Sequence, residues 1–269
     1  MTAPVRPRRR LYYGWLVLGV SVTGAFLAST TSQLFTGAML PDIEEGTGWS
    51  RSSITLAVTI GSMTAGFSSP IVGRLADRYG ARYLTAAGAI VVAVGMFMLA
   101  FSSAVHLILF YAGYIVGRGV AQNTLAGVVP RTTAVNWFRR MRGRSLGIVS
   151  MAIPLGGASL VPIAKLISSR YGWETVYVVF ALVLLAVVVP LALLVLRRRP
   201  EDMGLLPDGD EEPEPAADDS TDRPKTATEG YDFRLAQAMR TPAFWMLIAA
   251  MTCGTCSSGG LGFIGAESI

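Results

Sequence analysis

The sequence predicts an all-α protein embedded in a membrane, and three observations support this prediction. Hydrophobic residues make up 52% of the 269 residues and charged residues only 15%, whereas soluble domains are about one quarter charged. The charges gather in short clusters between long apolar stretches. Six of these stretches come close to the ~20 residues that a helix needs to cross ~30 Å of hydrocarbon. This pattern is typical of a polytopic membrane protein rather than of a soluble domain with a large core.

The first expected span, residues 12–39, follows a basic cluster and ends before Pro41. Its apolar run is about twice the ~7–15 residues of a signal-peptide core, so we expect an uncleaved helix. Asp42, Glu44 and Glu45 are expected to form an acidic outer loop. Ser50 or Ser52 is suited to cap the second span, because serine hydroxyls accept hydrogen bonds from a helix's first N–H groups.

The later spans are also delimited by charges and helix-breaking residues. Pro130 is expected to end the fourth span, and Arg197–Arg199 with Pro200 to end the sixth. The second to sixth expected spans are residues 51–72, 83–101, 106–129, 145–167 and 176–196.

The arginines predict how the chain crosses the membrane. Four precede the first span, and three, five and three follow the second, fourth and sixth spans, which makes fifteen on one side. The other side holds Arg51, Lys165 and Arg170. Cytoplasmic loops retain Lys and Arg, so we expect a multi-pass protein with a cytoplasmic N-terminus. The same bias explains the basic isoelectric point without nucleic-acid binding.

After the sixth span the composition changes. Residues 201–232 hold twelve of the eighteen acids and few apolar side chains, so we expect a disordered cytoplasmic linker. A short surface helix is expected over residues 231–240, and Thr241-Pro242 is typical of a helix start. The sequence therefore predicts a six-helix bundle over residues 1–200, a linker over 201–240, and an incomplete seventh helix within 241–269.

The loop expected between the second and third spans reads Gly-Arg-Leu-Ala-Asp-Arg-Tyr-Gly-Ala-Arg over residues 73–82. A connection this short makes the two helices antiparallel neighbours, and Asp77 is expected to pair with the surrounding arginines. The segment resembles the signature loop of the major facilitator superfamily. The resemblance implies a secondary transporter with no cofactor and no enzymatic activity, and a conformational role for Gly73, Asp77, Arg78, Gly80 and Arg82.

Three further segments resemble the oxalate/formate antiporter and monocarboxylate transporter branch of that family. They are Tyr12–Trp15, Asn136–Phe138 with the basic residues after it, and Arg198–Leu205. The first span lacks the lysine expected in animal monocarboxylate carriers, which favours the bacterial branch and hence an inner-membrane location. Pro154 is similar in position to the fifth-span Gly-Pro motif of facilitator antiporters, which implies a gating role.

Arg118 is the clear ionisable residue deep inside an expected span. At ~1.5 Å per residue it lies near the bilayer midplane, where a charge must face protein or a wet cavity. Tyr111, Tyr114, Arg118 and Gln122 recur at helical spacing and form an expected polar stripe. Gln33 is the corresponding candidate on the first span. We expect these residues to bind substrate, or else Arg118 to bond the carbonyls of neighbouring helices and Gln33 to join two helices.

The resemblance favours alternating-access transport of a small organic anion, a mono- or dicarboxylate, by a monomeric complete protein. A facilitator for drugs or other small solutes and a non-transporting membrane scaffold are the alternatives. Because such transporters rock one six-helix bundle against another, we expect this chain to be a fragment relative to its family and not to transport alone. With one histidine and no catalytic motif, the sequence offers little for hydrolytic or metal chemistry.

Overall fold

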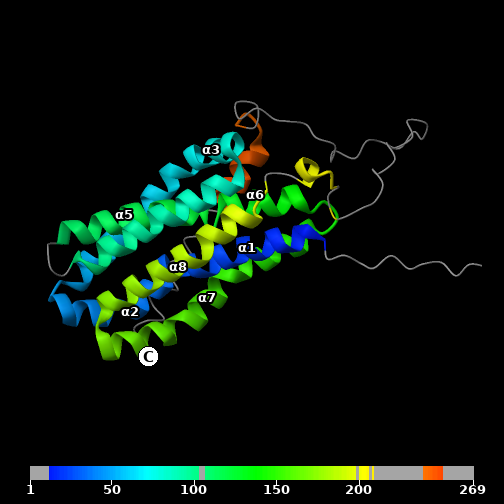
Figure 1. The fold of residues 1–269 in the computed structure, drawn as a ribbon. Coiled ribbons are helices and arrows are strands. Elements are labelled where there is room, and N and C mark those ends of the chain that lie inside the picture. Colours follow the sequence, from blue (N-terminus) through cyan, green and yellow to red (C-terminus); the bar gives the residue numbers. More distant parts are fainter. Residues whose placement is uncertain (1–11, 103–106, 198–199, 206–207, 209–238, 251–269) are drawn as a thin grey trace, which may run out of the picture. The chain divides into compact units, whose positions relative to one another are not determined.

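The computed structural model describes residues 12–102, 107–197, 200–205, 208 and 239–250. All regular elements among them are helical, as predicted (Figure 1). The chain divides into two compact units, Met1–Glu212 and Pro213–Ile269. In the described residues, four stretches qualify as membrane spans by length and composition: Tyr13–Thr47, Arg51–Ala100, Arg142–Tyr171 and Trp173–Val195.

The first span is interrupted, which the sequence did not predict. It consists of α1 (Tyr13–Ala28), the 3-10 turn η1 (Ser29–Thr31) and α2 (Gln33–Thr47). The hydroxyls of Thr30 and Thr31 donate to the carbonyls of Leu27 at 2.7 Å and Ala28 at 2.8 Å. Such local bonds compete with the helical pattern. Ser32 then starts α2, because its Oγ accepts from the N–H of Phe35 at 3.3 Å.

Pro41 does not end the first span. It lies inside α2, which continues to Thr47, so the expected acidic loop is wrong and its carboxylates extend from the last turns of a helix. This placement brings Asp42 to α7 (Arg142–Tyr171), where its Oδ1 lies 2.6 Å from Nζ of Lys165. The two residues join the first and fifth spans by an ion pair.

Helix α3 (Arg51–Ala100) contains both the second and the third expected spans. Ser50 caps it, as predicted, by accepting from the N–H of Ser53 at 3.3 Å. The expected loop over residues 73–82 is instead helical apart from Gly80, whose φ of 78° and ψ of 167° break the helix. A positive φ suits glycine because it has no Cβ. Gly73, Asp77 and Arg78 therefore lie in the last turns of the second span.

The two halves of α3 fold back on each other at Gly80, because both contact the same stretch of α5 (Leu107–Thr124). A Cβ on Gly61, before the joint, would lie 2.9 Å from the Tyr114 carbonyl oxygen. A Cβ on Gly95, after the joint, would lie 2.6 Å from Cα of Gly117. The prediction of antiparallel neighbouring helices is confirmed.

The fourth expected span is interrupted as well, and neither of its two helices is among the four stretches that qualify as membrane spans. Helix α5 ends at Thr124, and α6 (Val128–Trp137) begins after the turn at Gly127. The prediction that Pro130 stops the span is wrong, because this residue lies in the first turn of α6. There the missing proline N–H costs no helical hydrogen bond.

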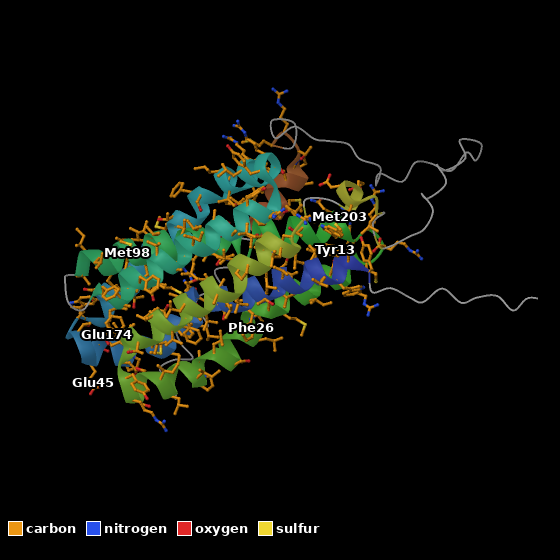
Figure 2. The ribbon with its side chains drawn as sticks, in the orientation of Figure 1. Tyr13, Phe26, Glu45, Met98, Glu174 and Met203 are labelled. Carbon is orange, nitrogen blue, oxygen red and sulfur yellow. The ribbon has the colours of Figure 1, made fainter. Side chains whose placement is uncertain are left out.

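Helices α7 and α8 (Trp173–Val195) correspond to the fifth and sixth expected spans. Helix α7 extends beyond its expected range at both ends, whereas α8 begins three residues earlier than expected and ends one residue earlier. Gly172, with a φ of 87°, forms the turn between them. The first unit has two ends: Glu45, Met98 and Glu174 lie at one, and Tyr13 and Met203 at the other (Figure 2).

The start of the expected linker belongs to the first unit. A 3-10 turn, η2 (Pro200–Met203), follows α8, and Pro200 is buried. Asp208 Oδ2 accepts from the backbone N–H groups of Arg139 at 2.8 Å and Arg140 at 2.6 Å. The prediction that residues 201–208 belong to a disordered linker is therefore wrong for those that are described. Residues 209–238, which include most of the expected surface helix, lie outside the described part.

In the second unit, residues 242–250 are helical. The N–H of Phe244 donates to the carbonyl of Thr241 at 3.2 Å, so the predicted helix start is confirmed. Residues 251–269, the rest of the expected seventh helix, lie outside the described part.

Candidate functional site

Arg118 projects from α5 toward two other elements of the bundle. Its Nε donates to Ser62 Oγ on α3 at 2.8 Å, and its Nη1 donates to the carbonyl of Thr31 in η1. The residue lies eleven positions after Leu107, about 17 Å along the helix. Both acceptors are neutral, and among the described residues no carboxylate pairs with this guanidinium. Within the described part of the bundle, Arg118 is therefore a half-buried cation without a counter-ion.

The backbone near Arg118 is built for this contact. A Cβ on Gly61 would lie 3.4 Å from Cβ of Arg118 and 2.9 Å from the Tyr114 carbonyl oxygen. The absence of a side chain at Gly61 thus lets α3 and α5 approach closely. This approach brings the next residue, Ser62, within hydrogen-bond distance of the guanidinium.

The expected polar stripe of α5 is not one surface. Tyr114 is buried, and its hydroxyl donates to Thr36 Oγ1 at 2.7 Å and lies 3.4 Å from the hydroxyl of Tyr177. The Tyr111 hydroxyl donates to the carbonyl of Ser53 at 2.9 Å. Gln122 is exposed on the bundle surface. The two tyrosines thus bond within the bundle, whereas Arg118 and Gln122 reach or approach its surface.

Gln33 lies at the first position of α2, directly after the interruption of the first span, and its side chain is exposed. The same interruption supplies the Thr31 carbonyl that Arg118 binds. The structure therefore places Gln33 two residues from a direct partner of Arg118, although no hydrogen bond joins the two side chains.

A second polar contact between α3 and α5 lies one turn further along. The Asn123 amide donates to the carbonyl of Ala65 at 2.7 Å and to Ser68 Oγ at 2.9 Å. Ser68 in turn donates to the carbonyl of Gly119 at 2.9 Å. Sequence reasoning missed Ser62, Ser68 and Asn123. A signal was present, since Ser62, Ala65 and Ser68 recur at helical spacing as small residues on one face of the second span.

The residues with expected conformational roles lie on two elements. Gly73, Asp77 and Arg78 precede the Gly80 joint and Arg82 follows it. The Arg78 guanidinium lies 5.4 Å from the ring centroid of Tyr79, and that of Arg82 lies 5.5 Å from the ring of Tyr83. Pro154 lies inside α7, exposed, and does not end that helix.

The site has the chemistry to attract an anion. A guanidinium is a permanent cation with five N–H donors, and at mid-depth in a bilayer it gains from a negative partner. In the described part of the chain, no group of three His, Cys, Asp or Glu residues is arranged to hold a metal ion. Long apolar helices around a half-buried arginine define a multi-pass helical membrane protein.

Comparison with known proteins identifies the family. The model of the Major Facilitator Superfamily matches residues 21–266. YcxA, an uncharacterized MFS-type transporter of Bacillus subtilis (strain 168), is 28% identical over 186 residues, 69% of this chain and 45% of the relative. Monocarboxylate transporter 2 of Homo sapiens is 27% identical over 188 residues, 68% of this chain and 37% of the relative. YhjX, an uncharacterized MFS-type transporter of Escherichia coli (strain K12), is 25% identical over 247 residues, which are 91% of this chain and 55% of the relative.

This chain belongs to the Major Facilitator Superfamily, a family of transporters and not of enzymes. The superfamily predicted from the signature segment is therefore confirmed. The chain spans about half the length of these curated relatives, or less.

Proposed function

We propose that the six-span unit is part of a secondary active transporter of small organic anions, mono- or dicarboxylates, that works by alternating access. The observation that carries this proposal is that no carboxylate of the described residues pairs with the guanidinium of Arg118, which we place near mid-depth of the membrane. Substrate sites of secondary transporters lie near the bilayer midplane. A carboxylate there would supply the negative charge that the described residues do not provide.

The substrate class is supported by a relative's name. Human monocarboxylate transporter 2 is similar to 68% of this chain, and a guanidinium binds carboxylates well because its planar N–H groups match two carboxylate oxygens. Gln33 and Gln122 are the other candidate ligands, since both are exposed and can donate amide hydrogens. Tyr114 is fully buried and the hydroxyl of Tyr111 is bonded to the Ser53 carbonyl. These two tyrosines would support the site from within the bundle.

We assign the conformational change to the hairpin joint and to α7. Gly80 turns the chain within one residue, with Arg78 and Arg82 on either side. Pro154 lies within α7, whose backbone hydrogen bonding it weakens. Gly73 and Asp77 complete the hairpin's last helical turns.

Counterflow uptake tests this function. The complete protein is reconstituted into vesicles preloaded with unlabelled oxalate, formate, lactate or a neutral sugar, and uptake of the same labelled solute is followed. We expect saturable exchange of at least one carboxylate and none of the sugar. Exchange of the sugar, or of a neutral drug, without any carboxylate would favour a facilitator of another class. No exchange of any solute would favour the scaffold alternative.

The orientation is predicted from the fifteen-to-three distribution of basic residues. In a cysteine-free background, single cysteines at Ala81 and Met141 should be protected from an impermeant thiol reagent in intact cells. A cysteine at Glu45, which lies with Met98 and Glu174 at one end of the unit (Figure 2), should be labelled. All three should react after permeabilisation. Labelling of Ala81 in intact cells would contradict the cytoplasmic assignment of the hairpin joint.

A further inference from the structure

We propose that Ser62 is a positioning residue, whose hydroxyl orients the Arg118 guanidinium so that its terminal amino groups face a carboxylate substrate. The inference rests on the proposed function, because it takes Arg118 as the anion-binding group. It assigns a role to a side chain of the second span that touches the guanidinium but need not touch the substrate.

The direction of the hydrogen bonds carries the first step. A serine hydroxyl has one proton, and Ser62 donates it to the carbonyl of Val58 at 2.8 Å. Its oxygen can therefore only accept from Arg118, whose Nε lies 2.8 Å away. The bond within α3 fixes the hydroxyl, and the fixed hydroxyl in turn holds Nε.

A second anchor completes the orientation. The Thr31 carbonyl accepts from Nη1 of Arg118, so two acceptors on different elements, η1 and α3, define the plane of the guanidinium. Nη2 has no hydrogen bond to any residue that the structure describes. One N–H of Nη1 and both of Nη2 are therefore left for a ligand. This edge can bind both oxygens of a carboxylate.

Removal of the hydroxyl should act through Arg118 and not through the helix. The carbonyl of Val58 keeps its ordinary partner, the N–H of residue 62, because that bond belongs to the helical pattern. The group that loses its partner is Nε of Arg118. A guanidinium held at one point instead of two can rotate, and a bidentate contact depends on its orientation.

The test compares three variants of the complete protein in the counterflow assay, with oxalate, formate or lactate, whichever the unaltered protein exchanges. We expect Ser62→Ala to raise the half-saturation concentration about tenfold and to leave the maximal rate within about twofold, since a charge-assisted bond orients the ligand-binding group. Ser62→Thr, which keeps the hydroxyl, should restore the original value. Thr59→Ala is the matched control, because this exposed hydroxyl bonds only its own helix, at Thr55.

An unchanged half-saturation concentration in Ser62→Ala, or a failure of Ser62→Thr to restore it, would overturn the inference. If Ser62→Ala lowers the amount of folded protein, Ser62→Cys is measured in its place. Sulfur accepts hydrogen bonds weakly, so this variant should also raise the half-saturation concentration. Arg118→Lys separates the two proposals. If it raises the half-saturation concentration and the Ser62 variants do not, the positioning role alone fails. If Arg118→Lys also has no effect, the anion site itself fails.

Discussion

Arg118→Lys should weaken binding of the carboxylate substrate by at least about tenfold while the protein still folds. Lysine keeps the positive charge but loses the planar fork that contacts two oxygens at once. It also cannot hold Ser62 and Thr31 while presenting two more N–H groups in one plane. The measurement is the concentration dependence of counterflow, with size-exclusion chromatography of the purified protein as the check on folding.

Arg142→Lys is the matched control, because this arginine is exposed at the first turn of α7. If Arg118 instead serves only to brace the interrupted first span, Arg118→Lys should lower thermal stability and leave affinity unaltered. Normal affinity and normal stability in Arg118→Ala would contradict both roles.

Gly95→Leu should prevent the first unit from folding, because α3 and α5 pack backbone against backbone at this residue. Even a single Cβ on Gly95 would lie 2.6 Å from Cα and N of Gly117 and 2.9 Å from the carbonyl oxygen of Gly113. None of these backbone atoms can turn away, so the helices must separate. Overpacking typically costs about 1–3 kcal/mol and occasionally more, and helices in membranes depend on such small-residue contacts.

The comparison with alanine makes this test quantitative. Gly95→Ala should lower the midpoint of thermal unfolding, whereas Gly66→Ala on the same helix should not, because a Cβ on Gly66 has open space around it. Thermal unfolding of the two detergent-purified variants, followed by size-exclusion chromatography, is the measurement. Equal midpoints would show that α3 and α5 are not in backbone contact at Gly95.

The sequence alone was sufficient for the helical class, for the family and for the approximate place of most spans. The helical class and the spans depend on hydrophobicity and charge summed over about twenty residues, and no single contact alters such a sum. The family was predictable from the signature segment over residues 73–82. The Ser50 cap was also predictable, since it depends on a hydroxyl next to the N–H groups that it binds. The sequence was therefore reliable for features that depend on residues within a single helix.

The interruptions of the first and fourth spans were not predictable in this way. The sequence is the same whether the hydroxyls of Thr30 and Thr31 point to solvent or bond the carbonyls of the preceding turn. It therefore does not show that the helix is interrupted there. The residue type predicts a helix end at both Pro41 and Pro130, yet one lies inside α2 and the other near the start of α6. A proline restricts the backbone in either direction along the chain, so the residue type alone does not say on which side the helix lies.

The candidate site was predictable only in its central residue. A charged side chain in an apolar stretch identifies Arg118 without any structure, but its partners come from residues 87 and 56 positions away. Ser62 follows a glycine whose importance depends on the approach of another helix. Tyr114 shares the helical spacing of Arg118 but is turned into the bundle, because Thr36 and Tyr177 satisfy its hydroxyl there.

The one-residue joint at Gly80 has a consequence for how the gene can vary. Surface connections usually tolerate insertions and deletions, but this connection contains a single non-helical residue, so an added residue must lengthen one of the two helices. One added residue in the first turn after Gly80 would rotate the rest of α3 by about 100° about its axis. Gly88 and Gly95 would then turn away from α5 and a bulkier face would meet it. The length of this hairpin is therefore constrained as tightly as the identity of any residue in it.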